Sequence, residues 1–352
     1  MIIGTCGFGS TGSSVISDYL LEYANKDVQV LDSIEFTWVS DTDGLIDLEH
    51  QLMNPHNRTK GSIVAIQRYI QHMKNCERHY EKCAGIKAEV LEKSVYRFLN
   101  GITDVSWNWY YKAGNMNLIE RLLKVSLMQA RVIPHLEKKK GAQIKCFPMK
   151  KVYLSMLPQN FDKLAKKHIR ELLNAMGGDL KKTIVLDQPF AGNNPQACFK
   201  YFDDPYAVVV DRDPRDNYVF AKTRLLGNNH FMAVDTVQDF VKYYRAIRDN
   251  QPYKKPDPRV LSLKFEELVY DYDNTTEKLR AFLKLSENPN PKSIFDPSLS
   301  INNTQVFRRF PQYKKDIEYI EANLSEYLFD FSRYPKPNLN GEMFFGKSPL
   351  HK

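Results

Sequence analysis

The feature that most constrains this chain is a glycine- and hydroxyl-rich loop at its start. Apolar residues 2–5 lead into Gly7-Phe-Gly-Ser-Thr-Gly-Ser-Ser14, and apolar residues at helical spacing follow from Val15. This order predicts a strand, a tight loop and the first turn of a helix. Glycines let the backbone wrap closely around a ligand, and the unpaired N–H groups of a helix N-terminus favour negative charge. The chain therefore opens on a predicted anion site.

The loop comes close to the triphosphate-binding pattern G-x-x-x-x-G-K-[ST]. Gly7 and Gly12 have the right separation, but Ser13 stands where the pattern has its lysine. The backbone cradle is thus predicted without the side chain that steadies a β/γ-phosphate. A plain strand-to-helix turn is the alternative, although three glycines beside the hydroxyls of Thr11, Ser13 and Ser14 exceed what a turn requires.

Length and charge narrow the class of protein. The 352 residues suit one elaborated α/β domain, and a content of 43% hydrophobic and 26% charged residues is typical of soluble globular proteins. A net charge of +8 favours anionic ligands, but no nucleic-acid-binding motif accompanies it, so we expect no nucleic-acid partner. No signal peptide or membrane-spanning run is evident, and five unpatterned cysteines fit a reducing compartment. These features predict a cytoplasmic protein, and they leave its oligomeric state open.

Strand-like and helix-like segments alternate along the chain. Short β-rich runs lie at residues 28–31, 183–187 and 206–210, with helical patterns between them. This alternation predicts an α/β fold with a doubly wound parallel sheet. We expect one domain over residues 1–352, with a C-terminal tail at 335–352.

A long helical insertion is predicted at residues 43–140. Its apolar residues recur at helical spacing, and it could form a lid or a wall for an acceptor. His72, Cys76, His79 and Cys83 recur at i, i+4, i+7 and i+11, which is too long a stripe for one tetrahedral ion, so we expect no metal site. The aromatic side chains of Trp107, Trp109, Tyr110 and Tyr111 suit buried packing or, alternatively, a site wall.

Acidic residues follow the predicted second strand. Asp32 and Glu35 would lie at the carboxyl edge of the sheet, where loops of parallel sheets carry ligand groups. A helix cap or a rim carboxylate is the alternative for each of them. Glu35 is therefore a candidate site residue at the same edge as the opening loop.

A second cationic cluster follows the clearest buried strand. The sequence Asp211-Arg-Asp-Pro-Arg-Asp216 places two arginines at the strand end, and Pro214 lets a helix begin at once. Arginine binds phosphate through two parallel hydrogen bonds. Considered alone, these charged residues could also form salt bridges with one another at the surface and have no ligand.

Three stretches, in this order and spacing, resemble the sulfotransferase superfamily. Ser10-Thr-Gly-Ser-Ser14 is similar to the family's 5′-phosphosulfate loop [KR]-S-G-T-T. The segment from Arg212 to Phe220 is similar to its 3′-phosphate motif R-x-P-x-D-x-x-x-S, and residues 260–271 resemble its segment around F-E-D-L. The family transfers the sulfuryl group of 3′-phosphoadenosine-5′-phosphosulfate (PAPS) to an acceptor. The loop also resembles a bacterial subgroup with G-x-G-x-T-G-S-S loops.

The resemblance implies a set of roles. PAPS would be the cosubstrate, adenosine 3′,5′-bisphosphate the product, and a carbohydrate or small alcohol the acceptor, with no metal required. Glu35 would be the catalytic base, as in related Golgi-type sulfotransferases, with His50, His56 and His72 as fallbacks. The implied cosubstrate-binding residues are Gly9, Ser10, Thr11, Gly12, Ser13, Ser14, Arg212, Asp216 and Arg308.

Three side chains that would donate to the cosubstrate in the family are replaced in this chain. Ser10 replaces the loop's Lys or Arg, Phe220 falls at the motif's serine, and Asp187 falls where a K-[TD]-P segment has lysine. Sulfuryl transfer spreads negative charge over oxygens, so another cation has to compensate. The candidates are Arg58, Lys60, Arg68 and Arg308.

Two other classes of function remain. Asp187 and Asp211 imitate the acidic strand ends that help to hold magnesium in P-loop kinases and NTPases. Alternatively, the lost donors could leave a nucleotide-binding protein without turnover.

Overall fold

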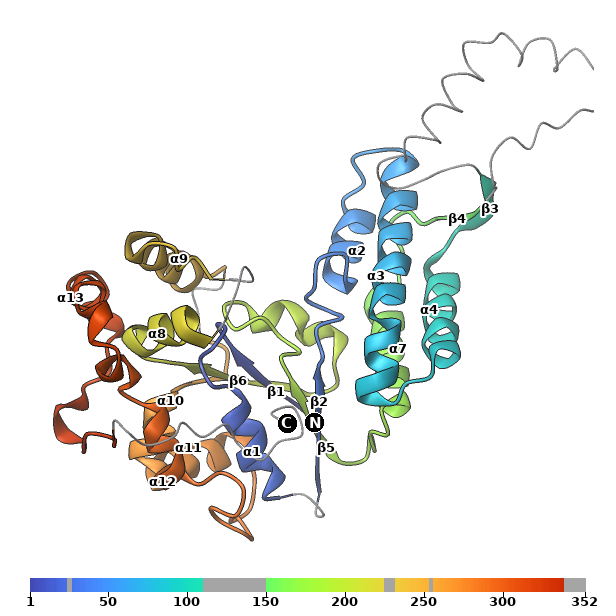
Figure 1. The fold of residues 1–352 in the computed structure, drawn as a ribbon. Helices are drawn as coiled ribbons and strands as arrows, with labels where there is room; N and C mark the ends of the chain where they lie inside the picture. Colours follow the sequence, from blue (N-terminus) through green and yellow to red (C-terminus); the bar gives the residue numbers. More distant parts are fainter. Residues whose placement is uncertain (24–26, 110–149, 225–231, 253–255, 339–352) are drawn as a thin grey trace, which may run out of the picture.

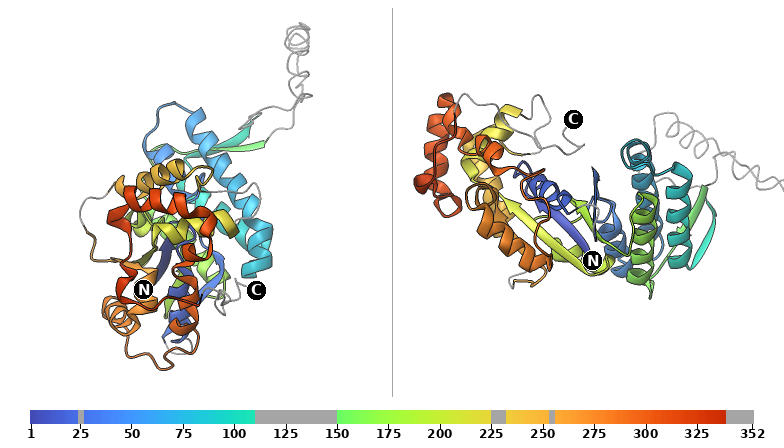
Figure 2. Two further views of the ribbon diagram at one scale, coloured as in Figure 1. Left: turned by 60° about the vertical axis from the view of Figure 1, so that its left-hand side comes forward. Right: turned by 90° about the horizontal axis from the view of Figure 1, so that it is seen from below.

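The computed structural model describes residues 1–23, 27–109, 150–224, 232–252 and 256–338. A sheet with its covering helices forms one part of the molecule, and a helical unit stands beside it (Figures 1 and 2). The strands of this sheet run in the order β2-β5-β1-β6-β7, and each neighbouring pair is parallel. Their bounds are β1 Ile2–Gly7, β2 Val28–Glu35, β5 Thr183–Asp187, β6 Pro205–Asp211 and β7 Val260–Lys264.

The sheet is buried on both faces. Ile3 and Val208 pack with helices α1 (Ser14–Leu21) and α11 (Tyr272–Leu283), whereas Ile2 and Leu186 belong to a second core shared with the helical unit. Successive side chains of a strand point to opposite faces, so a strand covered on both sides is apolar throughout. The predicted doubly wound parallel sheet is confirmed.

Strand β1 lies at the turning point of the topology. The chain passes from β1 to β2, fills the gap with β5, and then crosses β1 to reach β6 on its other side. In such sheets ligands bind at the carboxyl ends of the strands, where the order reverses. The opening loop follows β1 and therefore occupies this place.

The helical unit contains α2 (Leu45–Met53), α3 (Lys60–Ala84), α4 (Ala88–Ile102) and α7 (Phe161–Ala175). His168 of α7 holds three helices together, with Nε2 2.9 Å from the Tyr69 hydroxyl and Nδ1 2.8 Å from Ser94 Oγ. Burial lowers the pKa of His168 to about 4, so it is neutral in this network.

The predicted insertion at 43–140 contains a strand as well as helices. Residues 45–102 are largely helical, but β3 (Val105–Trp109) forms an antiparallel pair with β4 (Lys150–Leu154). Residues 110–140 lie outside the described part, as do residues 339–352 of the predicted tail.

The remaining helices cover the sheet and follow its later strands. None of the described helices combines the length and apolar character needed to cross a membrane. The remaining helices are α8 Pro214–Arg224, α9 Val237–Asp249, α10 Phe265–Tyr270, α12 Pro297–Ser300 and α13 Lys314–Asn323. The 3-10 turns are η1 Pro195–Tyr201, η2 Ile301–Asn303, η3 Val306–Arg309, η4 Pro311–Tyr313, η5 Ser325–Tyr327 and η6 Phe331–Arg333.

Candidate active site

The opening loop has the backbone of an anion cradle. Gly9, Ser10 and Gly12 have φ values of 86°, 53° and 81°, a left-handed region that glycine adopts without strain. Within the described residues, the backbone N–H groups of residues 9–14 donate to no acceptor. Helix α1 begins at the end of the loop and adds its dipole. Several of these N–H groups could therefore donate hydrogen bonds to a bound anion.

Side chains of the loop and of its neighbour set its shape. Thr11 is buried, and its Oγ1 accepts a hydrogen bond from the Phe8 N–H at 3.3 Å. Gln188, directly after β5, accepts from the Gly7 N–H at 3.2 Å and donates to Ser13 Oγ at 2.7 Å. Sequence reasoning missed Gln188, although its position at a strand end was the available signal.

Arg212 follows β6 and is buried. Its Cζ lies 4.0 Å from the Phe220 ring centroid and 4.8 Å from that of Phe265. The guanidinium donates to the Asn303 carbonyl, and its Nε has no hydrogen-bond partner in the described chain. Phe220, which stands at the family's serine position, thus stacks on Arg212 instead of offering a hydroxyl.

The loop and the arginine motif are joined directly. A Cβ on Gly12 would come within 2.8 Å of Phe265 Cδ2, so the Phe265 ring touches both Gly12 and Arg212. Asn217 of α8 also donates from Nδ2 to the Gly9 carbonyl at 3.0 Å. The two predicted anion sites therefore share a wall at one edge of the sheet.

Buried carboxyl groups surround Arg212. Burial and the charge of Asp213 raise the pKa of Glu266 to about 8, and burial raises that of Asp216 to about 6, with Arg212 opposing both shifts. Asp216 Oδ1 accepts from the Phe307 N–H at 3.1 Å. Arg215 pairs with Asp213 at 2.7 Å, which indicates a structural role for this second arginine.

The late segment presents two arginines in different settings. Arg308 is exposed and donates to Gln305 Oε1 at 2.8 Å. Arg309 is half-buried, donates to the Asn302 carbonyl at 2.9 Å, and interacts electrostatically with Asp216. The assignment of Arg308 to the 3′-phosphate stays a prediction, and Arg309 lies nearer to the motif's charges.

Two further cations engage Asp211, and one of them also contacts the loop. Arg248 of α9 forms two hydrogen bonds to Asp211, at 2.6 and 3.1 Å, and its Cζ lies 4.3 Å from the Phe8 ring centroid. Lys264, the last residue of β7, is 3.4 Å from the same carboxylate. Burial opposes ionisation of Asp211, but the two cations outweigh it and lower its pKa. This trio carries one net positive charge, which sequence reasoning missed.

Glu35 ends β2, beside Asp187 of β5. Its side chain is exposed, and its carbonyl accepts from the Tyr80 hydroxyl at 3.0 Å, which fixes its backbone. Glu35 therefore lies at the same sheet edge as the loop, two strands away from β1.

Several other candidates lie on the helical unit and are not brought to the loop. Arg58, Lys60 and His56 are exposed at the connection between α2 and α3, at the end of the unit that points away from the sheet (Figures 1 and 2). Arg68 pairs with Asp43 at 2.5 Å.

The histidine and cysteine stripe of α3 forms no metal-like cluster. His72 Nε2 lies 3.7 Å from Asp41, and His79 Nδ1 lies 3.7 Å from Cys83 Sγ. In the described parts of the chain, no three His, Cys, Asp or Glu side chains converge as metal ligands would.

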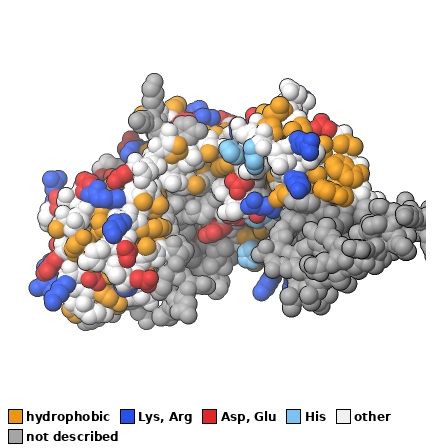
Figure 3. All heavy atoms as spheres, turned by 90° about the horizontal axis from the view of Figure 1, so that it is seen from above, with side chains coloured by type: hydrophobic (Ala, Val, Ile, Leu, Met, Phe, Trp, Pro, Cys, Tyr) orange, Lys and Arg blue, Asp and Glu red, His pale blue; other side chains and the backbone are white. Residues whose placement is uncertain are grey.

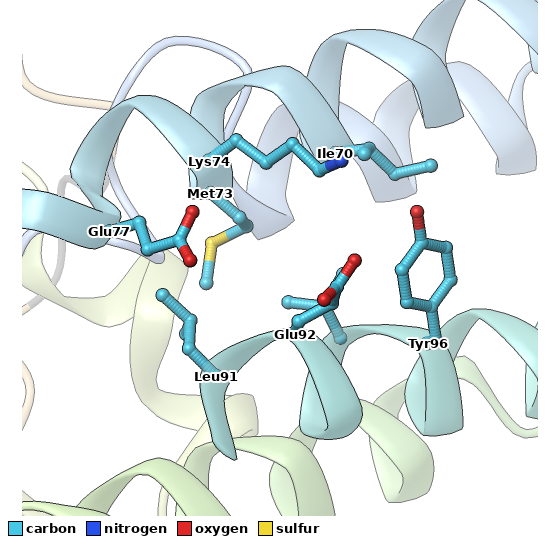
Figure 4. Close-up of a pocket in the computed structure, with 8 residues that line it drawn as sticks. Ile70, Met73, Lys74, Glu77, Leu91, Glu92 and Tyr96 are labelled. Carbon is cyan, nitrogen blue, oxygen red and sulfur yellow. The ribbon is translucent and has the colours of Figure 1, made fainter. Parts of the chain in front are cut away.

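Several clefts border the helical unit in the described part of the chain. One, of about 430 Å³, lies between α2 and η1 and is lined by Glu49, His50, Met53, Ala197 and Tyr201 among others. Segment η1 continues from the residues that support the loop, because Gly192 packs against the Gly7 carbonyl. A smaller cleft of about 180 Å³ lies between α3 and α4, where Lys74, Glu77 and Glu92 surround Met73 and Leu91 (Figure 4).

No protein-family model and no curated protein sequence matches the chain. Three solved structures overlap with its fold. Sulfotransferase STF1 of Mycobacterium tuberculosis H37Rv is 13% identical, with a TM-score of 0.33, over 82% of this chain and 68% of that one. The sulfotransferase domain of the Synechococcus PCC 7002 olefin synthase is 12% identical, with a TM-score of 0.33, over 87% and 78% of the two chains. The sulfotransferase domain of the curacin biosynthetic pathway is 13% identical, with a TM-score of 0.32, over 84% and 78%. All three are sulfotransferases.

Proposed function

We propose that this protein transfers the sulfuryl group of PAPS to a hydroxyl group of a carbohydrate or small alcohol. The observation that carries the proposal is the wall shared by the two anion sites. The Phe265 ring touches Gly12 of the loop and also stacks on Arg212. A ligand with anionic groups at both ends of a nucleoside matches this pairing, because one group meets the loop N–H groups and the other meets the guanidinium edge.

In this mechanism, the loop holds the 5′-phosphosulfate and Arg212 holds the 3′-phosphate. The acceptor oxygen forms a bond to sulfur while the bond from sulfur to the bridging phosphate oxygen breaks, and Glu35 takes the acceptor's proton. The leaving bisphosphate gains negative charge, which the N–H groups of residues 9–14 can stabilise. The trio of Arg248, Lys264 and Asp211 adds a net positive charge behind Phe8. We assign to it part of the compensation for Ser10.

The rival kinase or NTPase function needs an acidic strand end that is free to help hold magnesium. Asp211 is instead engaged by Arg248 and Lys264, and Asp187 is buried and accepts from Thr5 Oγ1 at 3.1 Å. Ser13 also lacks the charge of the usual loop lysine. These contacts favour the sulfuryl donor over a triphosphate.

The acceptor is assigned to the cleft between α2 and η1. Its volume of about 430 Å³ lies within the usual range of small-molecule sites. Met53 and Ala197 line it together with Glu49 and His50, a mixture that offers apolar contact and hydrogen-bonding groups to a sugar.

The proposal is tested by the transfer of labelled sulfate from PAPS to a panel of sugars, glycans and alcohols. Product is expected with the wild-type protein, and Glu35→Gln should lower kcat by about a hundredfold or more while leaving bisphosphate affinity unchanged. Tight bisphosphate binding without transfer to any acceptor would support the non-catalytic alternative. Turnover of ATP with magnesium, in place of PAPS, would overturn the proposal.

A further inference from the structure

An exposed apolar surface lies at the end of the helical unit that is remote from the sheet. Met53, Val105, Trp107 and Leu157 have exposed fractions of 41%, 49%, 37% and 47%. They come from the end of α2, from β3 and from the residues after β4. Apolar side chains of this size are usually buried, so a group of them at one end of the molecule indicates a binding surface.

Hydrogen bonds fix these segments against one another. The Leu157 N–H donates to the Leu52 carbonyl at 3.2 Å, and the Met156 N–H donates to Asp104 Oδ2 at 2.8 Å. The Ser155 N–H donates to Ser62 Oγ at 2.9 Å, which ties in the start of α3. These bonds place Met53, Val105, Trp107 and Leu157 on directly joined segments, and we call the four exposed side chains the distal patch.

Positive charge lies on the segments that carry the distal patch. Arg58, Lys60, Lys150 and Lys151 are all exposed on the same segments, whereas Asp104 is the carboxylate that these segments carry. Seen from above, hydrophobic side chains gather beside Lys and Arg on the helical-unit side of the molecule (Figure 3). The surface thus combines apolar side chains with an excess of three positive charges.

We infer that the distal patch docks onto the surface of an anionic lipid bilayer. Lys and Arg are attracted to anionic headgroups, and tryptophan prefers the boundary between headgroups and acyl chains. Trp107 and Trp109 lie side by side on β3, with ring centroids 6.4 Å apart, and present an aromatic pair to such a boundary. A second copy of this chain is a poorer partner, because two such surfaces would bring like charges together.

Docking at this end would leave the opening loop accessible and would bring the α2–η1 cleft, which Met53 also lines, next to the bilayer. The opening loop lies in the other part of the molecule (Figure 1). The inference therefore concerns where the protein works and does not depend on the proposed sulfuryl transfer.

The test is sedimentation of the full chain with vesicles of phosphatidylcholine, alone or with about one third phosphatidylglycerol. Binding is expected to the anionic vesicles only and to weaken as salt is raised. Because a cation near the bilayer contributes roughly fivefold, Lys150→Gln, on the same face of the hairpin as Trp109, should bind roughly fivefold more weakly. Trp107→Asp should reduce binding by at least about tenfold.

Leu180→Asp and Leu299→Asp are matched controls, because these leucines are 39% and 43% exposed on other elements. They should bind vesicles like the wild-type chain, and all variants should keep the wild-type melting temperature and bisphosphate affinity. An equal loss in the controls would overturn the inference, as would the absence of binding to anionic vesicles. A lipid-free dimer that Trp107→Asp dissociates would assign the patch to a second copy instead.

Discussion

At the residue scale, the second anion site depends on how Arg212 is held. Phe220 and Phe265 cover its guanidinium, and the Asn303 carbonyl accepts from it, so phosphate can meet only the remaining N–H groups. Lysine can neither stack in this way nor form two parallel bonds to phosphate. Arg212→Lys is therefore expected to weaken binding of adenosine 3′,5′-bisphosphate by about 2 kcal/mol, roughly thirtyfold, in isothermal titration.

Arg215→Lys is the control for that prediction. Arg215 belongs to the same charged cluster but is paired with Asp213 and Glu321. This variant should lower the melting temperature and leave bisphosphate affinity within about twofold of the wild-type value. An equal loss of affinity in both variants would show that the cluster acts only through folding.

The raised pKa of Glu266 predicts how stability depends on pH. Its pKa is about 8 in the folded chain against an ordinary value of 4.5, so the folded state holds the extra proton. The stability that this proton contributes is complete below the ordinary pKa and is lost as pH rises through about 8. Glu266→Gln keeps Oε1 as an acceptor for the Asp213 N–H and removes the charge.

The variant should melt at a higher temperature than the wild-type chain at about pH 9, and the two should converge near pH 5. Scanning calorimetry across this range measures the effect. Glu277→Gln, on the exposed surface of α11, should show no such divergence. A difference that is the same at every pH would contradict the assignment of the proton to Glu266.

At the element scale, the loop depends on Gly12 for two separable reasons. Its φ of 81° strains any other residue, and a Cβ would meet Phe265 at 2.8 Å. Gly85, after α3, has a similar φ of 67° but nothing within 4 Å of an added Cβ. Gly85→Ala should therefore cost about 1 kcal/mol of stability and leave bisphosphate binding intact.

Gly12→Ala is expected to lower bisphosphate affinity by at least about tenfold, because the added methyl displaces the wall shared with Arg212. Chemical denaturation and titration of both glycine variants separate folding from binding. If Gly12→Ala binds the bisphosphate normally, the Phe265 wall is not part of the site.

The elements that sequence could predict are those with strong local patterns. The strand before Gly7, the buried run before Asp211 and the helices after both loops follow from composition and spacing alone. The β3 strand was missed, although Trp107 and Trp109 alternate with polar residues at strand period. Arg248 could not be assigned, because its contact with the loop joins residues far apart in the chain. Gln188 offered only its position after a strand as a signal, and its bond to Ser13 is equally remote in sequence.

At the scale of the whole molecule, the cleft that we assign to the acceptor lies where α2 of the helical unit meets η1. We expect Ala197→Trp to fill this cleft and to raise the KM for the acceptor by about tenfold or more, with bisphosphate affinity unchanged. Steady-state kinetics with whichever acceptor supports turnover measure the change. Glu92→Trp at the α3–α4 cleft is the control and should leave KM as it is. A normal KM for Ala197→Trp would place the acceptor elsewhere.

The central claim is that one ligand occupies both anion sites across the Phe265 wall. The most direct measurement compares the affinities of adenosine 3′,5′-bisphosphate and adenosine 5′-monophosphate, which lacks the 3′-phosphate, by isothermal titration without added metal. The bisphosphate should bind at least about tenfold more tightly to the wild-type chain, and Arg212→Lys should remove most of that difference. Equal affinities for the two nucleotides in the wild-type chain would contradict the claim.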